Sequence, residues 1–149
     1  MKFSTITLAC LSTAIQARTL PSSPQILDSS TSILAKRAEV RCQNELGDIW
    51  IDLTLAAANL AAAPTETGRS GYPHEFRNFQ GFTWVDYRCH DRGPILELPI
   101  FADGHQYNTD SRPKDRPGEV RLIYTEYGKI FCGVIAHEQG SSGNFGMCT

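Results

Sequence analysis

The chain has 149 residues, 41% of them hydrophobic, with 14 basic and 16 acidic residues and a formal net charge of −2. An acidic balance disfavours non-specific binding to nucleic acid, because that affinity comes largely from neutralising phosphates. No apolar stretch approaches the roughly 20 residues needed to cross a bilayer, so the sequence disfavours a membrane span.

The first 37 residues are predicted to lie outside the fold. Residues 1–17 are typical of a signal peptide, since Lys2 gives a positive start, a short apolar stretch follows, and Ala17 is a small residue at the cleavage point. Residues 18–37 are rich in Ser and Pro and end in Lys36-Arg37, a dibasic pair of the kind that kexin-type proteases cut. We predict a pro-segment there; the alternative is a disordered tail that is never removed. Residues 38–149 then form the single domain of a secreted, extracellular protein, which we expect to be a monomer.

This domain is more acidic than the whole chain. The first 37 residues hold four of the 14 basic and one of the 16 acidic residues, so ten basic and fifteen acidic residues remain and the formal net charge is −5. The one dense basic cluster is Arg112, Lys114 and Arg116, in a segment with two prolines. It is either a solvated loop or a contact for substrate, and the sequence does not choose.

Four cysteines follow the signal peptide: Cys42, Cys89, Cys132 and Cys148. An even number in a short exported domain predicts two disulfides, for which three pairings exist. The chain has no Cys-x-x-Cys pair, which disfavours a zinc site.

A helix is predicted from Asp48 to Ala63, where apolar residues recur at three- and four-residue steps. Its Ala-rich end favours helix, Asp48 can cap its N-terminus, and Pro64 follows its last turn.

The other predicted elements are short strands, at residues 95–101, 120–125, 130–137 and 144–148. Tyr127-Gly128 supplies a turn, so the second and third strands are expected to form a hairpin. Short connections favour an antiparallel sheet, and one helix packed on such a sheet is an α+β domain.

Alternation along the strands places the charged residues on one face. Glu97 and Arg121 each lie opposite the apolar residues that would pack on the helix. In the third strand we expect His137 to share its face with Ile135 and Phe131. The charged groups could therefore converge on the open face of the sheet.

These residue types suit acid–base cleavage of a phosphodiester. RNA carries its own nucleophile, the 2′-hydroxyl, so an enzyme needs a base for its proton and an acid for the departing 5′-oxygen. A carboxylate suits the base, an imidazolium suits the acid near neutral pH, and an arginine fork matches phosphate oxygens. Such groups are offered, with no need of a metal or cofactor, by Tyr72, His74, Glu97, Arg121 and His137. Each signal is weak alone, and Arg121 could instead be a structural partner that compensates the burial of Glu97.

Several stretches of the chain resemble the fungal guanyl-specific ribonucleases. They are Tyr72–Phe82, Leu96–Ile100, Arg121–Tyr124, Gly133–His137 and the terminal Cys148-Thr149. The second half is also similar to the alpha-sarcin-type ribotoxins of the same superfamily, at Phe101–Tyr107, Ser111–Gly118 and Ile130–Gly133. The resemblance covers residues 42–149, and order, spacing and residue type agree at separate places.

The resemblance implies a role for each candidate. Glu97 would be the general base, with His74 beside it, and His137 the general acid. Arg121 and Tyr72 would bind the phosphate, Phe145 would line the site, and the product would be a 2′,3′-cyclic phosphate. It also implies one helix on a small twisted antiparallel sheet, with the disulfides Cys42–Cys148 and Cys89–Cys132.

The expected base-binding stretch is Phe76, Arg77, Asn78, Phe79 and Gln80. Two aromatics can sandwich a purine of single-stranded RNA; alternatively, Phe76 and Phe79 merely pack in the core. The family usually has an acid where Gln80 stands, so guanine preference is expected to be softer.

The sequence thus predicts a secreted, metal-independent endoribonuclease that cleaves single-stranded RNA preferentially after guanine. A cytotoxic effector delivered into other cells is a role that fits this activity. One alternative is a ribotoxin-like protein that makes a specific cut in ribosomal RNA. Ribotoxins carry a long lysine-rich loop between the His and Glu motifs, whereas residues 82–96 are few and contain no lysine. Another alternative is an inactive RNA-binding or interaction protein on the same scaffold.

Overall fold

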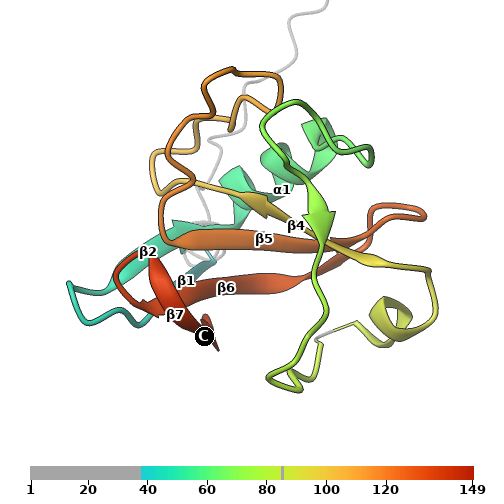
Figure 1. Cartoon of the computed structure of the whole chain (residues 1–149). Helices are drawn as coiled ribbons and strands as arrows, with labels where there is room; N and C mark the ends of the chain where they lie inside the picture. The colour runs from blue at the N-terminus through green and yellow to red at the C-terminus, as the bar shows by residue number, and fades with distance from the viewer. Residues whose placement is uncertain (1–37, 85) are drawn as a thin grey trace, which may run out of the picture. The chain divides into compact units, whose positions relative to one another are not determined.

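The computed structural model describes residues 38–84 and 86–149. The predicted signal peptide and pro-segment lie outside the described residues. Within the described part, one helix and seven strands alternate with loops (Figure 1). They are β1 (Glu39–Cys42), β2 (Ile49–Asp52), α1 (Leu53–Ala62), β3 (His74–Glu75), the 3-10 helix η1 (Tyr87–His90), β4 (Ile95–Pro99), β5 (Val120–Thr125), β6 (Phe131–Gln139) and β7 (Ser142–Met147). No helix among these residues is long and apolar enough to cross a membrane.

The strands form two antiparallel sheets. β1 and β2 make a hairpin, and the larger sheet has the order β3-β4-β5-β6-β7. β5 and β6 pair around the Tyr127-Gly128 turn, as predicted. The α+β fold class, with one helix on a small antiparallel sheet, is therefore confirmed.

The helix begins later than predicted. Asp52, not Asp48, is the N-cap, and its carboxylate accepts a 2.7 Å hydrogen bond from the amide of Thr54. Residues 49–52 pair instead with β1 as strand β2, and Asp48 forms an ion pair with Arg41 at 3.3 Å. The three- and four-residue periodicity predicted a longer helix because this local pattern does not show that residues 49–52 pair with another strand.

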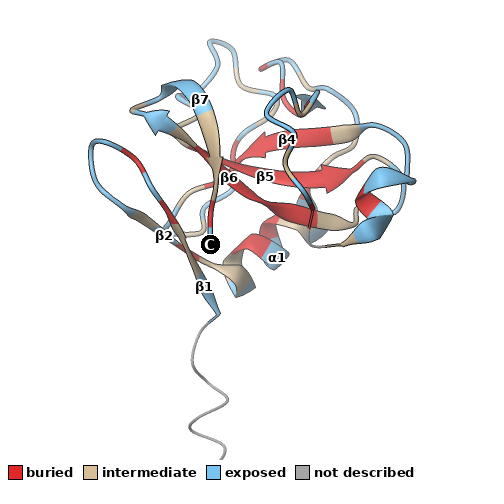
Figure 2. Cartoon of the chain, turned by 90° about the horizontal axis from the view of Figure 1, so that it is seen from below, coloured by how far each residue is buried: buried red, intermediate tan, exposed pale blue. Residues whose placement is uncertain are grey.

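The larger sheet separates two apolar clusters. On the helix side, residues of β4, β5 and β6 pack with α1. On the other side, Ile123 and Ile135 pack with Phe76, Trp84 and the cysteines 89 and 132. Figure 2 shows the three central strands as the most buried part of the sheet. Every residue of β5 is buried, which makes it a rigid base for side chains on either face.

One predicted face is wrong. The pairing of β5 with β6 is irregular between Ile123 and Tyr124, where Tyr124 lies opposite Phe131 and Ile123 opposite Gly133. The extra residue, Cys132, turns the side chains that precede it to the opposite face. Phe131 therefore packs against the helix-side cluster and does not share a face with Ile135 and His137.

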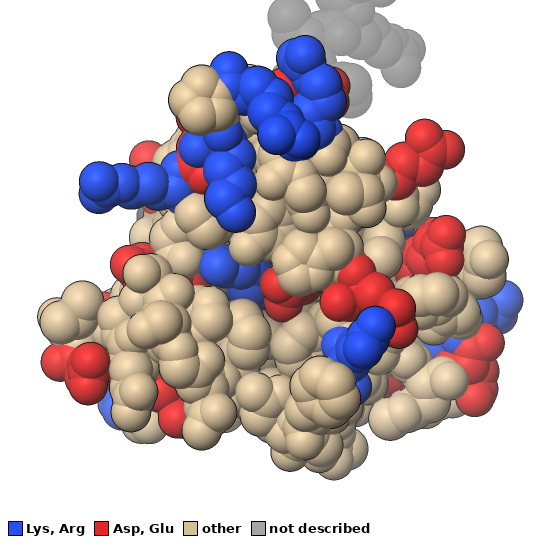
Figure 3. All heavy atoms as spheres, in the orientation of Figure 1, with Lys and Arg blue, Asp and Glu red and all other residues tan. Residues whose placement is uncertain are grey.

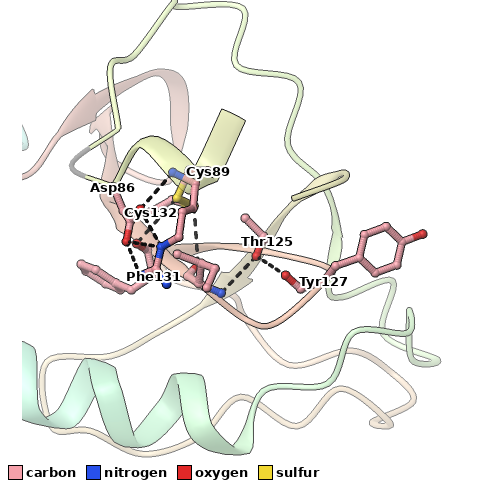
Figure 4. A network of polar contacts seen from close by, with 8 residues as sticks. Asp86, Cys89, Thr125, Tyr127, Phe131 and Cys132 are labelled. Carbon is pink, nitrogen blue, oxygen red and sulfur yellow. Dashed lines mark hydrogen bonds and ion pairs between the residues drawn. A yellow bond between two sulfur atoms is a disulfide. The ribbon is translucent and has the colours of Figure 1, made fainter. Parts of the chain in front are cut away.

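Both disulfides implied by the family resemblance are confirmed: Cys42–Cys148 and Cys89–Cys132. The first ties β1 to the end of the chain, and the second ties η1 to β6 (Figure 4). Beside the second bridge, the buried Thr125 hydroxyl donates to the carbonyl of Tyr127 and accepts from the amide of Ile130. The β5–β6 turn is thus held from within.

Candidate active site

His74 and Glu97 face each other across the pairing of β3 with β4. The Nε2 atom of His74 lies 3.0 Å from Oε1 of Glu97. Glu97 is only 6% exposed, whereas the His74 ring is about half exposed. The hydrogen bond to Glu97 raises the pKa of His74, against the opposing effect of partial burial. The pair combines a buried carboxylate with a solvent-facing imidazole that holds its proton more strongly than usual.

Arg121 lies on β5 and is 3% exposed. One of its terminal nitrogens, Nη1, donates to the carbonyls of Pro117, Gly118 and Val120, each at 3.0 Å. Its Nε atom is buried and has no hydrogen-bond partner among the described residues. The ring of Tyr72 covers the guanidinium, with 5.7 Å between the ring centre and Cζ. The neutral carbonyls leave the positive charge of the guanidinium uncompensated, and the buried Nε donor has no acceptor among the described residues.

Arg121 is not a salt-bridge partner of Glu97. The two side chains share a face, because Glu97 lies opposite Ile123 and Arg121 is two residues away. No ion pair within 4.0 Å joins them in the described part of the chain. The carboxylate is bonded to His74 instead, so the structural explanation considered for Arg121 does not apply.

Tyr72 is buried between the rings of His74 and Tyr107 and the guanidinium of Arg121. Its ring stacks on His74 with centroids 4.8 Å apart and meets the edge of Tyr107 at 5.3 Å. Burial raises the pKa of Tyr72, partly offset by the charge of Arg121. The hydroxyl therefore remains a neutral hydrogen-bond donor at physiological pH.

His137 stands on β6, opposite Phe145 on β7. The two rings stack with centroids 4.0 Å apart. Nδ1 of His137 lies 3.2 Å from the carbonyl of Gly143. Because a carbonyl can only accept, Nδ1 carries the hydrogen and Nε2 is left to act. Burial is the main cause that lowers the pKa of His137, and the charge of Arg121 lowers it further.

The expected base-binding stretch borders a hollow of about 240 Å³ next to this constellation. Its lining is His74, Glu75, Phe76, Arg77, Asn78, Phe79, Gln80, Glu97 and Phe145. The backbone turns at Asn78, which has a φ of 46°, and the Asn78 side chain bonds both the amide and the carbonyl of Phe82. The hollow thus joins His74 and Glu97 to all five residues of the predicted stretch.

The two phenylalanines of this stretch differ. Phe76 is 8% exposed and packs edge-on against Phe145 and Trp84, so it belongs to the core. Phe79 is 85% exposed and has no such packing. The expected aromatic sandwich is therefore not preformed, and Phe79 is the ring left free to stack on a base.

Sequence reasoning missed three residues around the site. Glu75 lines the hollow beside His74. Arg69 shares a second hollow, of about 460 Å³, with Arg112 and Lys114. Figure 3 shows basic side chains gathered where these loops lie. Asn44 contacts the backbone of His137 from the β1–β2 connection. In the sequence, the charges of Glu75 and Arg69 were the only signal for these two residues, and Asn44 had none.

The described residues contain no group of three or more His, Cys, Asp or Glu side chains that could hold a metal ion. A single helix on a curled antiparallel sheet, with a carboxylate, two imidazoles and a buried arginine on its open face, defines a small α+β protein suited to proton transfer next to an anion.

Comparison with known proteins identifies the family. A family model described as ribonuclease matches residues 38–149, and the chain belongs to this ribonuclease family. Ribonuclease clavin from Aspergillus clavatus is 38% identical over 121 residues, covering 63% of this chain and 68% of clavin. Guanyl-specific ribonuclease U1 from Ustilago sphaerogena is 36% identical over 80 residues, covering 54% of this chain and 69% of that protein.

Solved structures agree with this assignment. The crystal structure of restrictocin, an Aspergillus ribotoxin, has a TM-score of 0.67 and 33% sequence identity, and covers 75% of this chain and 99% of restrictocin. Restrictocin complexed with a 29-mer sarcin/ricin domain RNA analog matches with a TM-score of 0.66 and 30% identity over the same shares of the two chains. The chain therefore resembles ribotoxins in fold as well as in sequence.

Proposed function

We propose that this protein is a secreted endoribonuclease that cleaves single-stranded RNA, preferentially after guanine, through a 2′,3′-cyclic phosphate. One observation carries the proposal: the buried Glu97 is bonded to His74 on the same face as Arg121, whose buried Nε has no partner. An RNA phosphate placed there would meet a base, a cation and, from β6, an acid.

The first half of the reaction concerns the nucleophile. A Glu97 oxygen takes the proton of the 2′-hydroxyl while the 2′-oxygen attacks phosphorus. His74, whose Nε2 lies 3.0 Å from Oε1 of this carboxylate, keeps it oriented. The charge that builds on the phosphoryl oxygens is stabilised by Arg121 and the Tyr72 hydroxyl, which are fixed before the substrate arrives.

The second half concerns the leaving group. The bond from phosphorus to the 5′-oxygen breaks, and Nε2 of the protonated His137 gives its proton to that oxygen. The carbonyl of Gly143 holds Nδ1–H, so the imidazolium is stabilised and its second proton points away from Gly143. Hydrolysis of the cyclic phosphate would reverse the two roles.

A digest of defined RNA oligonucleotides tests this function. We expect fragments that end in a guanosine 2′,3′-cyclic phosphate or 3′-phosphate, and an unchanged rate when EDTA is added. An intact oligonucleotide after prolonged incubation would instead favour the inactive RNA-binding scaffold. A 3′-hydroxyl at the new end of the upstream fragment would rule out transphosphorylation.

Base preference is expected to depend on Gln80, which lines the hollow. A glutamine amide can accept from guanine N1–H and N2–H, but it can also donate to adenine N1 and accept from its N6 amine. A carboxylate cannot donate, and it forms stronger charge-assisted bonds with guanine. Gln80→Glu should therefore raise the ratio of kcat/KM for GpC over ApC by about tenfold, worth roughly 1.4 kcal/mol.

The matched control is Gln106→Glu, which adds the same charge at another exposed glutamine. An equal change of the GpC/ApC ratio in both variants would show a general charge effect and contradict base reading by residue 80.

The ribotoxin alternative rests on the basic hollow and the match to restrictocin. Arg69, Arg112 and Lys114 surround this hollow, and such a cluster can bind a second RNA phosphate although the domain as a whole is acidic. Intact ribosomes discriminate the two functions, because a ribotoxin releases one discrete RNA fragment whereas a general nuclease leaves a smear. The short connection between His74 and β4 favours the general nuclease.

A further inference from the structure

The connection between β1 and β2 reaches the strand end that carries His137. Asn44 in this connection is 9% exposed, although its neighbours in sequence are exposed. Its Nδ2 donates to the carbonyls of His137 at 2.7 Å and Gly140 at 2.9 Å, and its Oδ1 accepts from the amide of Leu46 at 2.9 Å. Figure 2 shows the hairpin with a buried stretch in its otherwise exposed connection. Both hydrogen bonds donated by the amide thus go to carbonyls of residues 137–140.

That segment is an irregular part of the sheet. The pairing of β6 with β7 shifts register between His137 and Gln139, so the strand ladder alone does not fix the backbone there. Asn44 bonds a carbonyl at each end of the irregular stretch, and the amide of Glu45 donates to the carbonyl of Glu138 at 2.9 Å between them. Three hydrogen bonds from one connection therefore fix the backbone beneath the ring.

The connection is itself firmly anchored. Asn44 follows Cys42, whose disulfide joins it to Cys148. Arg41 and Thr149 exchange two backbone hydrogen bonds, at 2.8 and 3.0 Å. The residues just before Asn44 are thus tied to the chain terminus. The ring of His137 contacts different groups, Phe145 and Gly143.

We propose that Asn44 is a positioning residue for the general acid: its amide sets the backbone at His137 so that Nε2 is directed at the departing 5′-oxygen. The inference rests on the proposed role of His137. Asn44 contacts the carbonyl of His137 and not its ring, so it acts through the backbone. Small misplacements of a catalytic group can lower a rate by as much as about 100-fold, so an effect of about tenfold on the acid-dependent step is expected.

The test compares two substrates that share the guanosine 3′-phosphate but have leaving groups that differ in their need for an acid. GpC needs a proton on its departing 5′-oxygen, whereas guanosine 3′-(4-nitrophenyl phosphate) releases a stable phenolate that needs none. Asn44→Ala should lower kcat/KM for GpC by about tenfold and for the nitrophenyl ester by less than about threefold. The ratio is taken on one preparation, so any unfolded fraction cancels.

Asn59→Ala is the matched control. Asn59 is 4% exposed and likewise donates to two carbonyls, those of Leu55 at 3.0 Å and Gly104 at 3.1 Å, but it belongs to α1. It should lose stability without changing the ratio of the two substrates. Asn44→Asp is the second variant, because it keeps the acceptor for Leu46 and removes both donors; it should show the same substrate ratio as Asn44→Ala.

His137→Ala separates this inference from the proposed function. A large loss with GpC and a small loss with the nitrophenyl ester identifies His137 as the acid. If His137→Ala gives this pattern and both Asn44 variants leave the ratio unchanged, the positioning role is wrong while the acid assignment stands. If His137→Ala itself affects both substrates equally, the acid assignment fails first.

Discussion

His137→Ala is expected to lower kcat/KM for RNA by about 10²–10⁴-fold, the usual contribution of a general acid. The 5′-alkoxide is a poor leaving group without a proton, and Nε2 of His137 is the imidazole nitrogen left free by the Nδ1 contact with Gly143. The fold should survive, because the ring is partly exposed and its backbone partners remain. Initial rates on GpC, with circular dichroism as a check on folding, measure the effect.

The pH profile gives a second signature of this residue. Burial lowers the pKa of His137. As the pH rises, His137 therefore loses its proton at a lower pH than an ordinary histidine does. The alkaline limb of the wild-type kcat/KM profile should therefore have its midpoint below about pH 6.5, the ordinary pKa of a histidine. This limb should be absent in His137→Ala.

His105→Ala is the control for this prediction. His105 is also exposed and has a polar partner, Asp103 at 2.6 Å, but it stacks on Phe101 outside the proposed site. Its removal should leave the rate and the alkaline limb unchanged. An equal loss of activity in the two histidine variants would contradict the assignment of the acid.

Glu97→Gln is expected to lower kcat/KM by a comparable factor, about 10²–10⁴-fold. The amide has the same shape and can still bond to His74, but it cannot take the proton of the 2′-hydroxyl. Both substrates, GpC and the nitrophenyl ester, should be affected, because each needs activation of the same nucleophile. This distinguishes loss of the base from loss of the acid.

His74→Ala decides between the two members of the pair. Because His74 only supports the carboxylate in the proposed mechanism, its removal should cost less than Glu97→Gln. A greater loss in His74→Ala would transfer the role of base to the imidazole. The control for Glu97→Gln is Glu126→Gln, which makes the same change of net charge at a carboxylate beyond the end of β5. It should leave the rate unchanged.

Strands β4, β5 and β6, which carry Glu97, Arg121 and His137, were predicted well from the sequence. Strand β3, which carries His74, and the N-terminal part were not. β5 matches its predicted range, and β4 and β6 differ from theirs by two residues at most. Their apolar runs are dense enough to mark a buried sheet locally. The β1–β2 hairpin was missed because its stability comes from pairing and from the disulfide to Cys148, neither of which is a local property.

The chemical groups of the site could be predicted from the sequence: one carboxylate, two imidazoles and one arginine in or beside strands, four cysteines after the predicted leader, and a glutamine in the expected base-binding stretch. These follow from residue identity and short-range periodicity.

How these groups meet depends on the tertiary structure. It bonds His74 to Glu97 and leaves the buried Nε of Arg121 without a partner. It separates the core residue Phe76 from the exposed Phe79. It also brings Asn44 beneath His137. Strand register, bulges and loop closure depend on contacts between distant segments, and a change of one residue in register reverses the face of every side chain that follows.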